Sequence, residues 1–96
     1  MDSKTRAKLR ACANKIQATV MLGKEGLTEN VLGQIEMDLT AHELVKIAVM
    51  QNCDIEPKDT INELAKVMMA DPVGVIGRKM IIYRYSSKCK NHILEK

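Results

Sequence analysis

The sequence predicts a small α/β domain with the element order α-β-α-β-α-β-β and a four-stranded mixed sheet. The chain has 96 residues, which is room for one domain, expected to span residues 1–96. Apolar residues recur at helical spacing in three segments, and short β-branched runs separate these segments. The last two runs are joined by a tight turn, so the final strand is expected to be antiparallel to its neighbour.

Three segments are expected to form helices. The first covers residues 4–16, and its apolar stripe consists of Leu9, Cys12, Ala13 and Ile16. The second opens at Leu27-Thr28, where Thr28 is a good N-cap, and runs to about residue 39. The third begins at Pro57, because a missing N–H is tolerated in the first turn of a helix.

Four short runs are expected to form strands: residues 19–22, 44–50, 73–76 and 80–85. In the second run, Val45, Ile47 and Val49 share one face while Lys46 points to the other. Asp71-Pro72 is expected to stop the third helix, and Gly77-Arg78-Lys79 to join the last two strands. The seven methionines are expected to pack between helices and sheet. The polar tail, residues 87–96, is expected to be frayed.

Composition argues against several classes of protein. The longest apolar run is four residues, such as 47–50, far short of the roughly 20 residues that a bilayer span requires. The first fifteen residues carry charges throughout and lack the apolar stretch of a signal peptide, so a cytoplasmic location is expected. Cys12, Cys53 and Cys89 lie far apart without a CxxC pair, which indicates incidental or buried thiols rather than a disulfide framework or a zinc site.

Catalytic and cofactor motifs are also missing from the sequence. His42 is expected at a helix–strand junction and His92 in the tail, and both are expected on the surface. Cys53 lies beside Asp54 but has no histidine close in sequence, although a pocket that joined it to His42 would revive an enzymatic hypothesis. The sequence therefore predicts no enzyme, no cofactor, no metal site and no small-molecule substrate.

Charge is distributed unevenly along the chain, whose net charge is +3. Residues 1–15 carry five basic side chains and one acid, and residues 78–96 carry six and one, whereas residues 16–77 carry four and ten. If the two basic ends meet in space, they form a positive face suited to a polyanion. The alternative is two separate solvated basic segments. Aromatic residues are limited to Tyr83 and Tyr85, so recognition by base stacking is not expected.

One motif carries specific chemistry: Gly23-Lys24-Glu25-Gly26 joins an expected strand to a capped helix. Glycines permit positive φ and a close approach of another backbone. The helix that follows presents free N–H groups near Glu29 and Asn30, which is an anion-binding arrangement. A GxxG loop of this kind clamps the nucleic-acid backbone in KH domains. The alternative is a plain βα turn that requires two glycines.

These residues also resemble a known family. The segment GKEGLTENV at 23–31 is similar to the GKxGLTxxV signature of the YhbY family, the free-standing form of the CRM domain. Further segments match in the same order: KTRAKL at 4–9, ELVK at 43–46, QNCD at 51–54 and VIGRKMIIYR at 75–84. The resemblance covers residues 4–85, and Glu25 and Gly74 depart from the family's usual residues.

The resemblance implies a fold like the C-terminal domain of translation initiation factor 3, with a KH-like GxxG loop. It further implies association with ribosomal RNA in precursors of the large ribosomal subunit. Carried over by motif, the candidate RNA contacts are Gly23, Lys24, Gly26 and Thr28 in the loop, Lys4, Arg6 and Arg10 on the first helix, and Arg78, Lys79 and Arg84 near the final hairpin.

The leading hypothesis is a monomeric, non-enzymatic RNA-binding protein that assists assembly of the large ribosomal subunit. One alternative is an interaction module that binds a ribosomal protein or an assembly factor through its acidic middle, including Glu36, Asp38 and Glu63. Another alternative is a DNA binder of related fold.

Overall fold

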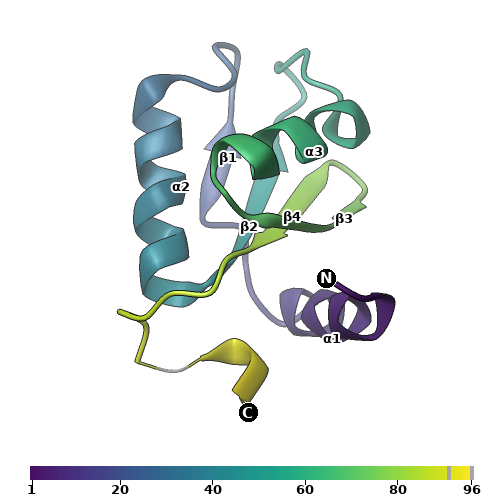
Figure 1. Ribbon diagram of the computed structural model, residues 1–96. Coiled ribbons are helices and arrows are strands. Elements are labelled where there is room, and N and C mark those ends of the chain that lie inside the picture. The colour runs from purple at the N-terminus through teal and green to yellow at the C-terminus, as the bar shows by residue number, and fades with distance from the viewer. Residues whose placement is uncertain (91, 96) are drawn as a thin grey trace.

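A four-stranded sheet with helices on both faces forms the structure, a computed structural model that describes residues 1–90 and 92–95 (Figure 1). The elements are α1 (Ser3–Ala13), β1 (Val20–Leu22), α2 (Glu29–His42), β2 (Leu44–Val49), α3 (Pro57–Val67), β3 (Asp71–Ile76), β4 (Lys79–Tyr83) and a short 3-10 helix, η1 (Ile93–Glu95). The predicted element order is therefore confirmed. No helix in the described ranges is long and apolar enough to cross a bilayer.

The sheet is mixed, with the strand order β1-β2-β4-β3. Strands β1 and β2 are parallel, with Leu22 opposite Val49, whereas β2 and β4 are antiparallel, with Ala48 opposite Lys79. The pairing of β3 with β4 is also antiparallel, as the sequence predicted. The carboxyl ends of β1 and β2 and the β3–β4 turn consequently lie at one end of the sheet, which we call the loop end.

Each face of the sheet has its own apolar cluster. Helices α2 and α3 cover one face, where Leu22, Ile35, Ile47 and Leu64 are among the buried residues. Helix α1 covers the other face, together with partly buried residues 93–94. The alternation predicted for β2 is confirmed, since Val45, Ile47 and Val49 pack with α2 and α3.

Helix α1 ends at Ala13, so the prediction that it continues to residue 16 is wrong. The buried ammonium of Lys46 donates to the carbonyl oxygens of Ala13 at 3.1 Å and Ile16 at 3.2 Å. Both carbonyls face the sheet because the chain turns there toward β1. Ile16, assigned to the apolar stripe, is instead 37% exposed.

Helix α3 ends at Val67, earlier than the predicted stop at Asp71-Pro72, and both of those residues belong to β3. Met69 adopts a φ of 54°, and the N–H of Ala70 donates to the carbonyl of Ala65 at 2.7 Å. The N–H of Met69 donates to Lys66, which completes a Schellman arrangement with a methionine at the usual glycine position. The sequence lacked the glycine that normally marks this kind of ending.

The methionines do not pack as predicted. Met68 and Met80 are buried, but Met1, Met21, Met37, Met50 and Met69 are exposed. Met21 points to the face of β1 opposite the buried Val20 and Leu22, and the residue is 61% exposed there. Composition alone does not reveal which methionines the helices reach.

Lys46 generates a prediction about stability. Exchange of Lys46 for Met removes the donor for two carbonyls beneath α1, and an unsatisfied buried polar group costs about 1–3 kcal/mol. We expect the free energy of unfolding, measured by urea denaturation, to fall by an amount in that range. The control is Lys66→Met, because Lys66 is exposed on α3. Equal stabilities of the two variants would contradict the role assigned to Lys46.

Candidate nucleic-acid interface

The glycine loop, residues 23–26, connects β1 to α2 at the loop end of the sheet (Figure 1). The N–H of Gly26 donates to the carbonyl of Gly23 at 3.0 Å, which leaves Lys24 and Glu25 exposed at the tip. Gly26 has a φ of +68°, and an added Cβ would lie 3.1 Å from the Cδ1 of Ile55. Gly23 has neither a positive φ nor a neighbour within 4 Å of an added Cβ. The positive φ and the contact with Ile55 therefore require a glycine at position 26. Gly23 is not required for the fold in this way, but without a side chain it leaves the loop surface accessible.

The loop leads directly into the amino terminus of α2. Thr28 caps this helix, as predicted, because its Oγ1 accepts the N–H of Val31 at 3.2 Å. In the described part of the chain, the N–H groups of Glu29 and Asn30 have no hydrogen-bond partner. These groups and the helix dipole favour an anion. The carboxylates of Glu25 and Glu29 oppose Lys24, so the charge at the tip is not itself positive.

Arg78 organises the neighbouring part of the loop end. Its guanidinium donates to the carbonyls of Val49 at 3.1 Å, Met50 at 3.1 Å and Cys53 at 3.2 Å. The N–H of Met50 donates in turn to Leu22, directly before the glycine loop. The β3–β4 turn is thereby fixed beside the segment that borders the glycine loop.

An open groove of about 550 Å³ lies between the β3–β4 turn and the end of β2. Its lining includes Gln51, Asn52, Arg78 and Lys79. We use the term loop-end surface for the glycine loop, residues 50–52, Arg78 and Lys79. QNCD at 51–54 is one of the matching motifs, but its sequence predicts no role for Gln51 and Asn52, because their place beside Arg78 depends on the sheet.

Arg84 lies at the opposite end of β4 and is not brought to the loop-end surface. Its guanidinium binds both carboxylate oxygens of Glu36, at 2.9 and 2.7 Å, and donates to the carbonyl of Met68 at 3.0 Å. The hydrogen bond from Arg84 lowers the pKa of Glu36 below its ordinary value, and Glu36 raises the pKa of Arg84. Such a bidentate pair joins α2 to the end of β4 and gives Arg84 a structural position.

The helix group, Lys4, Arg6 and Arg10, is also separated from the glycine loop. Figure 1 shows α1 and the loop at opposite ends of the molecule, with α1 on the face away from α2. Arg10 donates to the carbonyl of Val73 at 3.3 Å, and its guanidinium covers Gly74, where an added Cβ would lie 2.8 Å from Nη2. Glycine at position 74 therefore makes room for Arg10. The structure therefore does not bring the candidate contacts on α1 together with those of the glycine loop.

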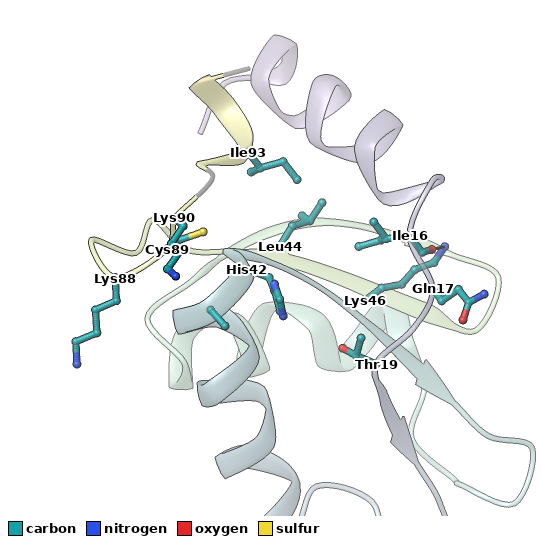
Figure 2. Close-up of a pocket in the computed structure, with 11 residues that line it drawn as sticks. Ile16, Gln17, Thr19, His42, Leu44, Lys46, Lys88, Cys89, Lys90 and Ile93 are labelled. Carbon is teal, nitrogen blue, oxygen red and sulfur yellow. Dashed lines mark hydrogen bonds between the residues drawn. The ribbon is translucent and has the colours of Figure 1, made fainter.

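The two basic ends of the chain do meet on the α1 face. Ile93 packs against the cluster that contains Leu9 and Ala13. Beside it lies an open groove of about 730 Å³, the tail groove, whose lining includes Lys46, Lys88 and Lys90 (Figure 2). Apart from Arg84, the described cations of the two basic chain ends thus lie in two regions, the loop end and the α1 face with its tail groove, rather than on one continuous face.

The histidines differ in their surroundings. His42, the last residue of α2, is exposed as predicted. His92 was also predicted on the surface, but its side chain is only 19% exposed and its Nδ1 lies 2.8 Å from the Oε2 of Glu43. Its position depends on a contact between residues far apart in the sequence.

Comparisons with known proteins relate this chain to a domain family and to proteins whose names refer to RNA binding. A sequence model described as the CRS1 / YhbY (CRM) domain matches residues 1–84. A Haemophilus influenzae protein named "RNA-binding protein" is 37% identical over 91 residues, which cover 94% of this chain and 91% of the relative. "Probable RNA-binding protein YqeI" of Bacillus subtilis is 31% identical over 90 residues, 94% of each chain. The solution structure of the hypothetical protein SAV1595 from Staphylococcus aureus has a TM-score of 0.78 and 33% identity, with 91% of each chain covered.

The two glycines of the loop generate a matched pair of variants. Gly26→Ala places a side chain in the left-handed region, which costs roughly 1–2 kcal/mol, and presses it against Ile55. Gly23→Ala meets neither obstacle, so its effect on the free energy of unfolding is expected to stay within about 0.5 kcal/mol. Chemical denaturation of both variants measures the difference. A larger loss for Gly23→Ala than for Gly26→Ala would refute this description of the loop.

Proposed function

Because the chain belongs to the CRS1 / YhbY (CRM) domain family, we propose that it binds RNA through the loop-end surface. The observation that carries this proposal is the exposed glycine loop at the carboxyl ends of the parallel strands β1 and β2, directly before the capped amino terminus of α2. The relatives carry the names "RNA-binding protein" and "Probable RNA-binding protein YqeI", and the loop supplies a physical means of holding a sugar–phosphate backbone.

In the proposed complex, a phosphate lies over the glycine loop. The N–H groups of Glu29 and Asn30 and the ammonium of Lys24 face this phosphate, and the hydroxyl of Thr28 still has its hydrogen to donate. Gly23, with open space around its Cα, lets the RNA backbone approach closely. Because the tip has no net positive charge, the free N–H groups and the helix dipole must supply the attraction for this phosphate.

The groove beside the loop would receive the adjoining nucleotides. Lys79 offers a second cation, and the side-chain amides of Gln51 and Asn52 offer donors and acceptors to a ribose 2′-hydroxyl or a base edge. Arg78 acts as a positioning residue here, since its guanidinium holds the groove wall through three carbonyls. Recognition then relies on RNA shape and backbone, in keeping with an aromatic content of 2%.

The remaining predicted site residues have other places in this proposal. Arg84 positions β4 through Glu36. Lys4, Arg6 and Arg10 belong to the separate α1 face, where they attract a polyanion that approaches that face. Direct contacts are therefore proposed for Gly23, Lys24, Gly26, Thr28 and Lys79.

We further propose that the RNA is ribosomal RNA in precursors of the large subunit, as the resemblance to free-standing CRM proteins implies. The proposed role is binding by a single copy, without a catalytic step. The alternative of a protein partner for the acidic middle has less support, because the carboxylates of Glu36 and Asp38 already bond to Arg84 and Thr19. Of the three acids named for it, Glu63 is the one that stays exposed on α3 for such a partner.

The site assignment predicts a change in the salt dependence of binding. Each neutralised phosphate of a single strand contributes a slope of about −0.7 to log K against log salt. A Lys24→Ala, Lys79→Ala double variant is expected to weaken binding to a fluorescently labelled single-stranded RNA and to flatten the slope by about 1.4. Fluorescence anisotropy at several salt concentrations measures both quantities.

The matched control removes the same charge from α1 through Lys4→Ala and Lys8→Ala, both exposed residues. Its slope is expected to change less than that of the loop-end variant. A flattened slope in the α1 variant with an unchanged slope in the loop-end variant would reject the loop-end assignment. Stronger competition by duplex DNA than by unlabelled RNA would instead favour a DNA-binding protein.

The ribosomal part of the proposal predicts the RNA recovered from cells. Ultraviolet crosslinking, followed by sequencing of the attached RNA, is expected to yield mostly large-subunit ribosomal RNA. Recovery of mostly messenger or transfer RNA would overturn the ribosomal role while leaving RNA binding intact. Association with particles that survives complete nuclease treatment would support the protein-partner alternative.

A further inference from the structure

We propose that Glu43, Cys89 and His92 form a binding site for a divalent transition-metal ion of the zinc class. One ligand atom from each side chain lies within 4.8 Å of the others. Glu43 is fully buried, Cys89 is 8% exposed and the His92 side chain is 19% exposed. The sequence places two residues between Cys89 and His92, but only the fold adds Glu43, so spacing alone gave no sign of the site.

The donor set suits zinc. Zn²⁺ binds thiolate sulfur, imidazole nitrogen and carboxylate oxygen in tetrahedral sites, and three protein ligands leave one position open. Cys89 also lines the tail groove (Figure 2). In this proposal, a water molecule or another ligand from the groove takes the open position. The carboxylate and the thiolate together balance the charge of the ion, and the thiol proton leaves to solvent on binding.

Backbone groups hold the Glu43 carboxylate in position. Glu43 follows α2 with a φ of 69°, and its side chain is fully buried. Its Oε2 accepts the N–H of Ser86 at 2.8 Å, and its Oε1 accepts the N–H of Ile93 at 3.0 Å. Carboxylate oxygens have further lone pairs, so these hydrogen bonds orient the Glu43 carboxylate and still leave it able to coordinate a metal ion.

The two residues from the tail are positioned as well. The His92 ring stacks on Tyr85 with centroids 4.8 Å apart and an interplanar angle of 12°. The N–H of Cys89 donates to the carbonyl of Ser86 at 3.2 Å, and the Ser86 hydroxyl donates to Thr40 at 2.6 Å. The turn that carries Cys89 is therefore attached to α2.

The ion would lie between groups that contact each other directly in this structure. The Nδ1 of His92 and the Oε2 of Glu43 are 2.8 Å apart, whereas tetrahedral ligands at zinc bond lengths lie about 3.3 Å apart. A small outward shift of His92 opens that distance, and the proton shared between Nδ1 and the carboxylate moves to Nε2 or, from an imidazolium, to solvent. The metal then replaces a hydrogen-bonded clamp by three coordinate bonds between the tail and the start of β2.

Cobalt provides a direct test with the full-length, thiol-reduced protein. Titration with Co²⁺ is expected to reach one ion per chain and to produce the near-ultraviolet charge-transfer absorption of a cobalt–thiolate bond, which Zn²⁺ then removes by displacement. Cys89→Ser is expected to abolish this absorption, and His92→Gln to weaken binding at least tenfold. Cys12→Ala is the control that retains it, because Cys12 lies on α1, outside the cluster.

Absence of the thiolate absorption in the wild-type protein, or its persistence in Cys89→Ser, would overturn the proposal. Circular dichroism of each variant establishes that it is folded. Thermal unfolding gives a second readout, since Zn²⁺ is expected to raise the Tm of the wild type but not that of Cys89→Ser. The RNA affinity of the metal-free protein tests the proposed function separately, so either proposal can fail alone.

Discussion

Two buried charges at the start of the central strand hold both ends of the chain on the sheet. Glu43 lies directly before β2 and accepts bonds from Ser86, His92 and Ile93, while Lys46 within β2 donates to the last turn of α1. An unpaired buried charge is costly, so each side chain is stable only because these partners surround it. Burial alone would raise the pKa of Glu43, but the Ser86 N–H, then His92 and the Ile93 N–H, lower it below its ordinary value, which keeps the carboxylate ionised.

This arrangement separates a structural end of the molecule from an end free for binding. The Glu36–Arg84 pair lies at the structural end with Glu43, where α2 and β4 finish. The loop end is organised by the Arg78 guanidinium, so the glycine loop and its neighbouring groove need few other long-range bonds. A rigid sheet with exposed loops at one end is the usual arrangement for a binding surface.

Local patterns in the sequence predicted the element order, the Thr28 cap and the faces of β2, because these depend on neighbouring residues. These patterns failed for features that depend on residues far apart in the sequence. The end of α1 depends on Lys46, which lies far away in the sequence. A cation is available to bind RNA only if no backbone carbonyl occupies it, and the carbonyls that occupy Arg78 are brought near it by the fold. The strand order that separates α1 from the glycine loop has no local signature. The predicted fraying of the tail stays a prediction, although residues 92–94 contact Glu43 and the α1 cluster.

The separation of the two basic regions constrains the proposed RNA. Electrostatic attraction is largely screened beyond about 8 Å at physiological ionic strength, and the molecule measures 37 Å along its longest axis. Cations of α1 therefore cannot strengthen a phosphate contact at the glycine loop directly. An RNA that uses both regions must pass around the sheet from the loop end to the α1 face. A folded RNA presents separate backbone segments in that geometry, whereas a short single strand reaches one region at a time. An RNA that binds both regions is thus a structured RNA, whose shape contributes specificity that the few aromatic residues of the chain do not supply.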